Sequence, residues 1–175
     1  APTVPQVTPT VAPMATALPL KITKDVVYAT PLPPNDSEWK LDVYAPADAK
    51  PAPLVLFLHG FAEYKEDYAR LYRLIAEQGT IVLGVEWPER APFAIRDDNR
   101  KRSRHLFETL GCAIRFARAN YGGDRAQVTL MGFSAGAGAG AAVAFAGADA
   151  DRAWDAFAAS GGPPSQVRCV AIGSS

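Results

Sequence analysis

Short apolar runs alternate with longer amphipathic segments along most of this chain. Leu54–Leu58, residues 80–85 and residues 128–131 are continuous apolar runs of the length expected for buried strands. Between these runs, residues 66–78 and 102–120 carry apolar side chains at the i, i+3, i+4, i+7 spacing of one helical face, and Gly79 is the expected stop of the first helix. The order strand, helix, strand, helix, strand predicts a parallel sheet with crossover helices.

Two shorter β-type segments, residues 26–30 and 40–44, precede the first buried run. Proline-rich and polar turn residues separate them, so the sequence predicts an antiparallel hairpin at the edge of the sheet. Side chains alternate between the two faces of a strand. In the second strand the expected inward positions are Leu41 and Val43, and the opposite positions are Asp42 and Tyr44.

The first twenty residues have a different composition from the rest. Prolines at positions 2, 5, 9, 13 and 19 alternate with Thr, Val and Ala, which favours an extended linker that builds no core. The predicted organisation is therefore a linker or tail over residues 1–20 and one domain over residues 21–175. Tails of this kind follow cleaved export signals or lipid anchors, so we expect a secreted or cell-envelope protein; an arbitrary sequence boundary is the alternative.

Charge and hydropathy narrow the classes of partner. Lys plus Arg and Asp plus Glu both number 18, which leaves no electrostatic footprint for nucleic acid or for an anionic membrane surface. No apolar stretch approaches the roughly 20 residues of a transmembrane helix. The equal numbers of acidic and basic residues fit a small neutral substrate better than nucleic acid or a membrane surface.

The pentapeptide Gly132-Phe133-Ser134-Ala135-Gly136 follows the apolar run at 128–131 and precedes a stretch of small residues. Gly-x-Ser-x-Gly is typical of a nucleophile elbow, in which the serine occupies a cramped strand-to-helix turn that only small flanking residues permit. The amide after the serine then begins a helix and points toward the oxygen of an attacked carbonyl. Ser134 is therefore the candidate nucleophile.

Two further segments match in the expected order. Residues 53–58 end in His59-Gly60-Phe61, and residues 121–130 resemble the turn and strand that enter the elbow of carboxylesterases and lipases. From about Val27 onward the chain resembles the α/β-hydrolases of esterase or lipase type. The resemblance implies a mostly parallel sheet with flanking helices.

The same resemblance implies an oxyanion hole formed by the amides of Phe61 and Ala135, with Gly132 and Gly136 as the elbow glycines. The single glycine after His59 departs from the His-Gly-Gly-Gly esterases. It looks more like many lipases, polyester hydrolases and dienelactone hydrolases. No metal and no organic cofactor is suggested.

The general base is missing from the expected place. In this fold an Asp or Glu and then a His follow the serine, but the only histidines, His59 and His105, both precede it. We interpret His59 as a buttress of the oxyanion turn and His105 as a surface residue. The carboxylates after Ser134 resemble a polar helix end, and none is assigned as the acid: Asp149, Asp151 and Asp155.

We therefore expect an N-terminal portion of a longer hydrolase, truncated before the C-terminal strands, with residues 167–172 forming one more strand or a loop before it. The expected function is carboxylic-ester hydrolysis with small-molecule, lipid or polymer esters as substrates, catalytically incomplete in this chain. A serine peptidase of the same fold and a non-catalytic binding domain remain alternatives. Reading the coding sequence past Ser175 for an acid followed by a histidine discriminates between them.

Two cysteines, Cys112 and Cys169, are too few for a disulfide framework and lack metal-ligand spacing. Cys112 lies on a predicted helix, where a buried free thiol is common. In exported α/β-hydrolases a cysteine pair near these places can be bridged. Both alternatives stay open at this point.

Overall fold

The computed structural model describes residues 16–31, 38–48, 52–87, 99–122, 128–145 and 167–169. Strands and helices alternate through most of these residues. The strands are β1 (Leu20–Pro31), β2 (Trp39–Pro46), β3 (Leu54–Leu58), β4 (Ile81–Val85), β5 (Val128–Gly132) and β6 (Val167–Cys169). The helices are the 3-10 turn η1 (Lys65–Tyr68), α1 (Ala69–Ala76), α2 (Asn99–Ala117), the π-helical turn η2 (Arg118–Gly122) and α3 (Ala135–Phe145).

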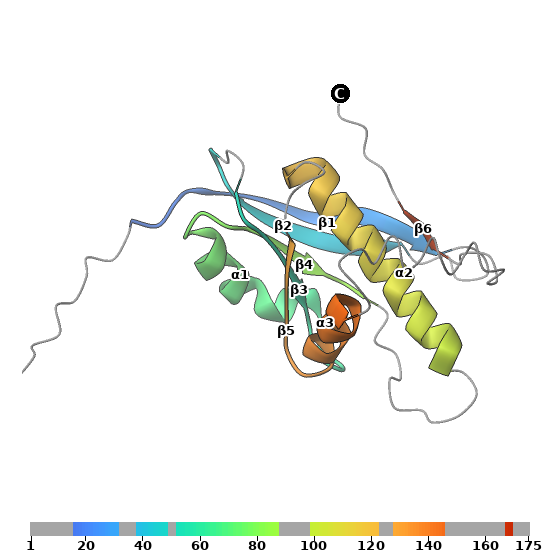
Figure 1. The fold of residues 1–175 in the computed structure, drawn as a ribbon. Coiled ribbons are helices and arrows are strands. Elements are labelled where there is room, and N and C mark those ends of the chain that lie inside the picture. The colour runs from blue at the N-terminus through green and yellow to red at the C-terminus, as the bar shows by residue number, and fades with distance from the viewer. Residues whose placement is uncertain are drawn as a thin grey trace, which may run out of the picture.

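The described strands form one sheet in the order β5-β3-β4-β2-β1-β6 (Figure 1). β3 pairs parallel with β4 and β5, as the alternation of strands and helices predicts. The pairs β2–β4, β1–β2 and β1–β6 are antiparallel, so the sheet is mixed and its parallel part is limited to three strands. The expected hairpin forms, but it is not at the edge along its whole length, because β6 pairs with residues 29–31 of β1.

Helices cover both faces of this sheet, with α1 on one side and α2 and α3 on the other (Figure 1). The larger core lies on the α2 and α3 side, where Leu56 and Leu83 meet Leu110 and Val143. The smaller core lies on the α1 side. Its buried members are Tyr44, Phe57, Tyr72, Ala76 and Val82.

The helix predicted over residues 66–78 is present as η1 followed by α1. Gly79 ends this segment with a φ of 91°, a left-handed value that glycine adopts without strain. α1 lies close to the sheet because β4 has a glycine beneath it. A Cβ at Gly84 would stand 2.3 Å from Cε2 of Tyr72, so a larger residue there would push the helix away.

The outward positions expected in β2 are corrected by the structure. Asp42 and Tyr44 are 0% and 1% exposed, because η1 and α1 cover the face that the alternation assigned to solvent. The buried carboxyl group of Asp42 makes three contacts. Its oxygens lie 2.5 Å from Nζ of Lys24 and 3.2 Å from Nζ of Lys65, and they accept the backbone N–H of Asp25 at 3.0 Å.

The boundary of the packed chain lies slightly before residue 21. Leu20 begins β1, Ala47 donates its N–H to the Pro19 carbonyl at 2.8 Å, and Leu18 donates to the Glu77 carbonyl at 3.2 Å. Most of the predicted linker, residues 1–15, lies outside the described residues. None of the described helices combines the length and apolar character required to span a bilayer.

Cys112, on the buried side of α2, is disulfide-bonded. The only other cysteine of the chain is Cys169, which belongs to β6. α2 packs against both β6 and β1. Of the two alternatives for Cys112, a free thiol or a bridged one, the structure has the bridged one.

We predict that Lys65→Met lowers the free energy of unfolding by about 3 kcal/mol, because it removes one partner from a fully buried carboxylate. Lys40→Met is the matched control, since Lys40 contacts Glu38 at 3.9 Å with both side chains well exposed. Urea unfolding followed by circular dichroism measures both changes. Equal effects of the two substitutions would contradict the importance of the Asp42 network.

The Lys65 contribution should be independent of pH between about 6 and 9. Burial alone lowers the pKa of Lys65, but hydrogen bonds to Glu66, Asp25 and Asp42 outweigh it and raise the pKa above the usual lysine value. A raised folded-state pKa gives stability that is complete below the unfolded value, about 10.4, and lost only as pH rises through the folded value. Repeating the urea titrations of both proteins at pH 6 and 9 checks this.

Reduction of the Cys112 disulfide should destabilise the protein by roughly 2–4 kcal/mol, because the bridge restricts the unfolded chain over a long loop. Mass spectrometry after alkylation without reductant reads the bond directly in protein isolated from an oxidising compartment. Two freely alkylated thiols would contradict the bridge. A thermal shift on adding reductant measures its contribution.

Candidate active site

Ser134 stands at the corner between β5 and α3. Its φ is 48°, a left-handed value that costs a non-glycine residue of order 1–3 kcal/mol, and the residue is exposed at the surface. Gly136 donates its N–H to the Phe133 carbonyl at 2.9 Å, and Gly138 donates to the Ser134 carbonyl at 3.1 Å. The turn is thus closed by its own backbone, and the serine lies outside it.

The two glycines of the pentapeptide are required by close backbone approaches. A Cβ at Gly136 would stand 2.1 Å from the carbonyl oxygen of Leu58 and 2.4 Å from that of His59. A Cβ at Gly132 would stand 2.6 Å from the carbonyl carbon of Gly136. These contacts involve main-chain atoms, which cannot move aside as a flexible side chain can. The start of α3 therefore lies directly against the end of β3.

The segment that follows β3 forms a tight turn over residues 60–63. Glu63 donates its backbone N–H to the Gly60 carbonyl at 3.3 Å, and Ala62 has a φ of 59° at the third position. A positive φ at that position is typical of a type II turn and is normally given to glycine. Phe61 lies at the second position with 51% of its surface exposed.

The two expected oxyanion donors lie on these two segments. Ala135 is the first residue of α3, where an amide has no intrahelical acceptor and the helix dipole favours a negative charge. Phe61 is two residues beyond His59, whose carbonyl lies against Gly136. The structure therefore brings Ser134, Ala135 and the His59–Phe61 turn to one corner of the sheet.

His59 is 3% exposed, and its ring and carbonyl both make hydrogen bonds in this turn. Its Nδ1 donates to the Gly60 carbonyl at 2.9 Å, because a carbonyl can only accept. Trp87 donates its indole N–H to the His59 carbonyl at 3.3 Å, and the two rings lie 5.7 Å apart. The sequence signal for Trp87 is its place just after β4, since the parallel register aligns Val85 with Leu58.

The remaining candidates for base and acid fall outside this description. His105 belongs to α2, but its side chain is not among the described ones. The carboxylates Asp149, Asp151 and Asp155 also lie outside the described residues. The described part of the chain therefore provides a nucleophile position and amide donors, and it assigns no base.

Glu63 and Tyr68 belong to this site although the sequence did not indicate them. Oε2 of Glu63 accepts the Gly60 N–H at 2.7 Å and the Tyr68 hydroxyl at 2.5 Å. Burial, followed by this hydrogen bond, raises the pKa of Tyr68 to about 12. The hydroxyl is thus a donor throughout the neutral range.

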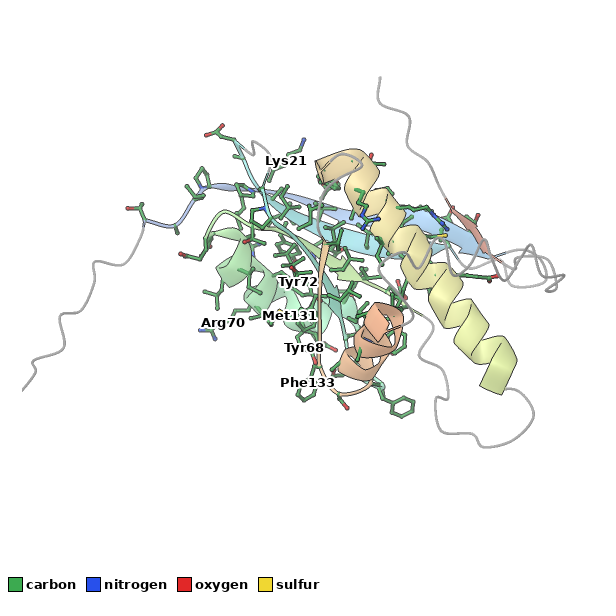
Figure 2. All side chains as sticks on the ribbon, in the orientation of Figure 1. Lys21, Tyr68, Arg70, Tyr72, Met131 and Phe133 are labelled. Carbon is green, nitrogen blue, oxygen red and sulfur yellow. The ribbon has the colours of Figure 1, made fainter. Side chains whose placement is uncertain are left out.

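Aromatic side chains connect the smaller core to the elbow, as Figure 2 shows for Tyr72, Tyr68 and Phe133. The ring of Tyr68 lies 6.4 Å from the ring of Tyr72 and 6.4 Å from that of Phe133. Large apolar side chains are also exposed on the serine turn and on the segment that follows β3. These are Phe61, Tyr64 and Phe133, at 51%, 66% and 57% exposure.

One acidic cluster has the spacing of metal ligands. Oxygens of Asp25, Asp42 and Glu66 lie within 4.8 Å of one another on the α1 side of the sheet. The ammonium group of Lys65 contacts all three carboxylates and supplies positive charge among them. The cluster is therefore compensated by a side chain of the protein itself.

Two solved esterase structures are similar to this chain in fold. A brefeldin A esterase, a bacterial homologue of human hormone-sensitive lipase, matches with a TM-score of 0.55 at 14% identity, over 81% of this chain and 38% of that one. Esterase B from Lactobacillus rhamnosis, inhibited by a tributyrin phosphonate, matches with a TM-score of 0.54 at 20% identity, over 85% and 46%. The chain has the α/β-hydrolase fold.

A curated relative agrees with this α/β-hydrolase assignment. A probable isoprenylcysteine α-carbonyl methylesterase of Oryza sativa subsp. japonica is 38% identical over 104 residues, which cover 55% of this chain and 23% of the rice protein. No model of a known protein family matches the sequence. The chain thus spans less than half of the length of each of these three proteins.

We predict that Gly136→Ala destabilises the protein by about 3 kcal/mol or more, since the added methyl meets main-chain oxygens. Gly138→Ala is the matched control in the same helix, because its Cβ meets nothing within 4 Å. Alanine favours a helix over glycine, so the control should gain about 0.5–1 kcal/mol. Thermal unfolding of both variants decides, and equal midpoints would contradict the close approach.

Proposed function

We propose that this chain carries the nucleophile and the oxyanion hole of a serine-dependent carboxylic-ester hydrolase. The observation that carries the proposal is the left-handed Ser134 at the strand-to-helix corner, seated against the His59–Phe61 turn. A strained, exposed serine beside an unsatisfied helix N-terminus is the arrangement that acyl transfer requires. The rice methylesterase and the two esterase structures support the same chemistry.

In the proposed reaction, Oγ of Ser134 forms a bond to the acyl carbon while its proton passes to a base. The carbonyl electrons move onto the oxygen, and the amides of Phe61 and Ala135 bind the resulting oxyanion. Collapse of this intermediate expels the alcohol with a proton from the base and leaves an acyl-serine. Water then releases the acid by the same steps in reverse order.

The proposal assigns neither histidine of this sequence, His59 or His105, as the base. His59 is occupied by its own turn, with Nδ1 on the Gly60 carbonyl and the ring beside Trp87. In this fold the acid and histidine come after the serine along the chain. The contacts of His59 in the turn after β3 can therefore stay as they are during the proposed reaction.

For the substrate we propose a neutral ester with an apolar portion, whether a small molecule, a lipid or a polymer. Phe133 beside Ser134 and Phe61 and Tyr64 on the segment after β3 expose apolar surface, and the chain has equal numbers of acidic and basic residues. The Cys112 disulfide supports a secreted or cell-envelope location, because such bonds persist in oxidising compartments. The esters named for the relatives fit this class.

We predict that Ser134→Ala abolishes hydrolysis of p-nitrophenyl butyrate by the protein expressed from its full coding sequence. A fluorophosphonate probe should label Ser134 there, and peptide mass spectrometry locates the label. The 175-residue chain should be far slower, because a site without its base retains only about 10³–10⁴-fold catalysis over water from the oxyanion hole and binding.

His105→Ala serves as the control in the same protein and should change the rate little, since His105 has no assigned role. Full activity of the 175-residue chain would instead make His59 or His105 the base. Labelling at any residue other than Ser134 would overturn the proposed nucleophile.

A further inference from the structure

The turn that carries Phe61 closes with a long backbone hydrogen bond. The Glu63 N–H lies 3.3 Å from the Gly60 carbonyl oxygen, and Ala62 has a positive φ that costs a residue other than glycine free energy. Side-chain contacts to Gly60 therefore bear on the direction of the Phe61 amide.

The peptide plane between Gly60 and Phe61 is fixed from the carbonyl side. The Gly60 oxygen accepts Nδ1–H of His59 at 2.9 Å and the Glu63 N–H. In a trans peptide the N–H points opposite to the C=O. Holding the Gly60 oxygen toward His59 therefore directs the Phe61 N–H to the other side of the plane.

The other end of Gly60 is fixed by the carboxylate of Glu63. Its Oε2 accepts the Gly60 N–H at 2.7 Å and the Tyr68 hydroxyl at 2.5 Å. Hydrogen bonds to an ionised acceptor are about twice as strong as neutral ones. With both the N–H and the C=O of Gly60 bound, its two backbone dihedrals have little freedom.

Tyr68 gives this carboxylate a rigid support. Its ring lies 4.5 Å from the ring of Phe57, a buried residue of β3, and 6.4 Å from that of Tyr72. On the other side it lies 6.4 Å from Phe133, the neighbour of Ser134. The hydroxyl that holds Glu63 is thus anchored to the core beneath the elbow (Figure 2).

We propose that Glu63 is a positioning residue for the oxyanion hole, acting through Gly60 and supported by Tyr68. This inference rests on the proposed function and adds a residue to the same site. The carboxylate transfers no proton and touches no substrate. It keeps the Phe61 amide aimed at the oxygen that becomes charged in the transition state.

The test compares Glu63→Ala, Glu63→Gln and Asp67→Ala in the protein expressed from its full coding sequence. Asp67 is the matched control, because its Oδ2 accepts the backbone N–H of Tyr64 at 2.8 Å with the same three-residue spacing, one turn farther along the chain. Rates with p-nitrophenyl butyrate are divided by the concentration of sites that a fluorophosphonate titrates. This removes any effect of misfolded protein.

Glu63→Ala should lower kcat by about 10–100-fold with little change in KM, since a misdirected oxyanion donor acts on the transition state. Glu63→Gln keeps a carbonyl oxygen for both bonds and should stay within about threefold of the parent. Asp67→Ala should match the parent. Tyr68→Phe, which retains the ring but loses the hydroxyl, should fall between the parent and Glu63→Ala.

Equal kcat values per titrated site for Glu63→Ala and Asp67→Ala would overturn the positioning role, as would an effect on KM alone. If Glu63→Ala fails to fold, Tyr68→Phe with a parental kcat overturns it in the same way. Failure of the proposed function looks different: Ser134→Ala then retains activity and the probe leaves Ser134 unlabelled.

Discussion

The approach of Gly136 to the carbonyl oxygens of Leu58 and His59 is the constraint on which this corner of the molecule depends. A Cβ at Gly136 would overlap both oxygens, so only glycine lets α3 begin directly against the end of β3. Because β3 and β5 are parallel, the turn after β3 and the serine turn both leave the sheet at its carboxyl end. The proposed chemistry follows from that meeting of two strand ends.

A different kind of contact, between charged side chains, lies on the α1 side of the sheet. There the interior contains the carboxyl group of Asp42, which contacts the ammonium groups of Lys24 and Lys65. Burying ions is expensive unless each is paired, and this network pairs them with well-placed hydrogen bonds. Lys65 begins η1 just after the turn over residues 60–63, so the network also fixes where that turn ends.

Most of the strands, the crossover helices and the strand-to-helix turn at Ser134 could be predicted from the sequence because their signals are local. An apolar run, a helical face and Gly-x-Ser-x-Gly each require only neighbouring residues. Asp42 was misplaced for a physical reason: alternation tells which residues share a face, but a sheet covered on both sides buries both sets. The pattern of β2 alone does not reveal that η1 and α1 cover it.

The contacts that the sequence did not reveal join residues through space or through a short turn. Glu63 looks like an ordinary exposed acid in a polar loop until its carboxylate is seen on Gly60 and Tyr68. The pairing of β6 with β1 joins residues at opposite ends of the described chain, so no local pattern indicates it. The sequence left the state of Cys112 undecided for the same reason, because spacing along a chain does not give the distance between two side chains.

The fixed ends of the turn after β3 limit how this protein can diverge. Residues 60–64 connect the end of β3, which contacts Gly136, to Lys65, which contacts Asp42. An inserted or deleted residue would therefore disrupt one of these two contacts. Loops are usually the segments that change length most readily between related proteins. Here length is the property least free to vary. Within residues 60–64, the exposed side chains of Phe61 and Tyr64 are the positions that can be replaced without a change of length.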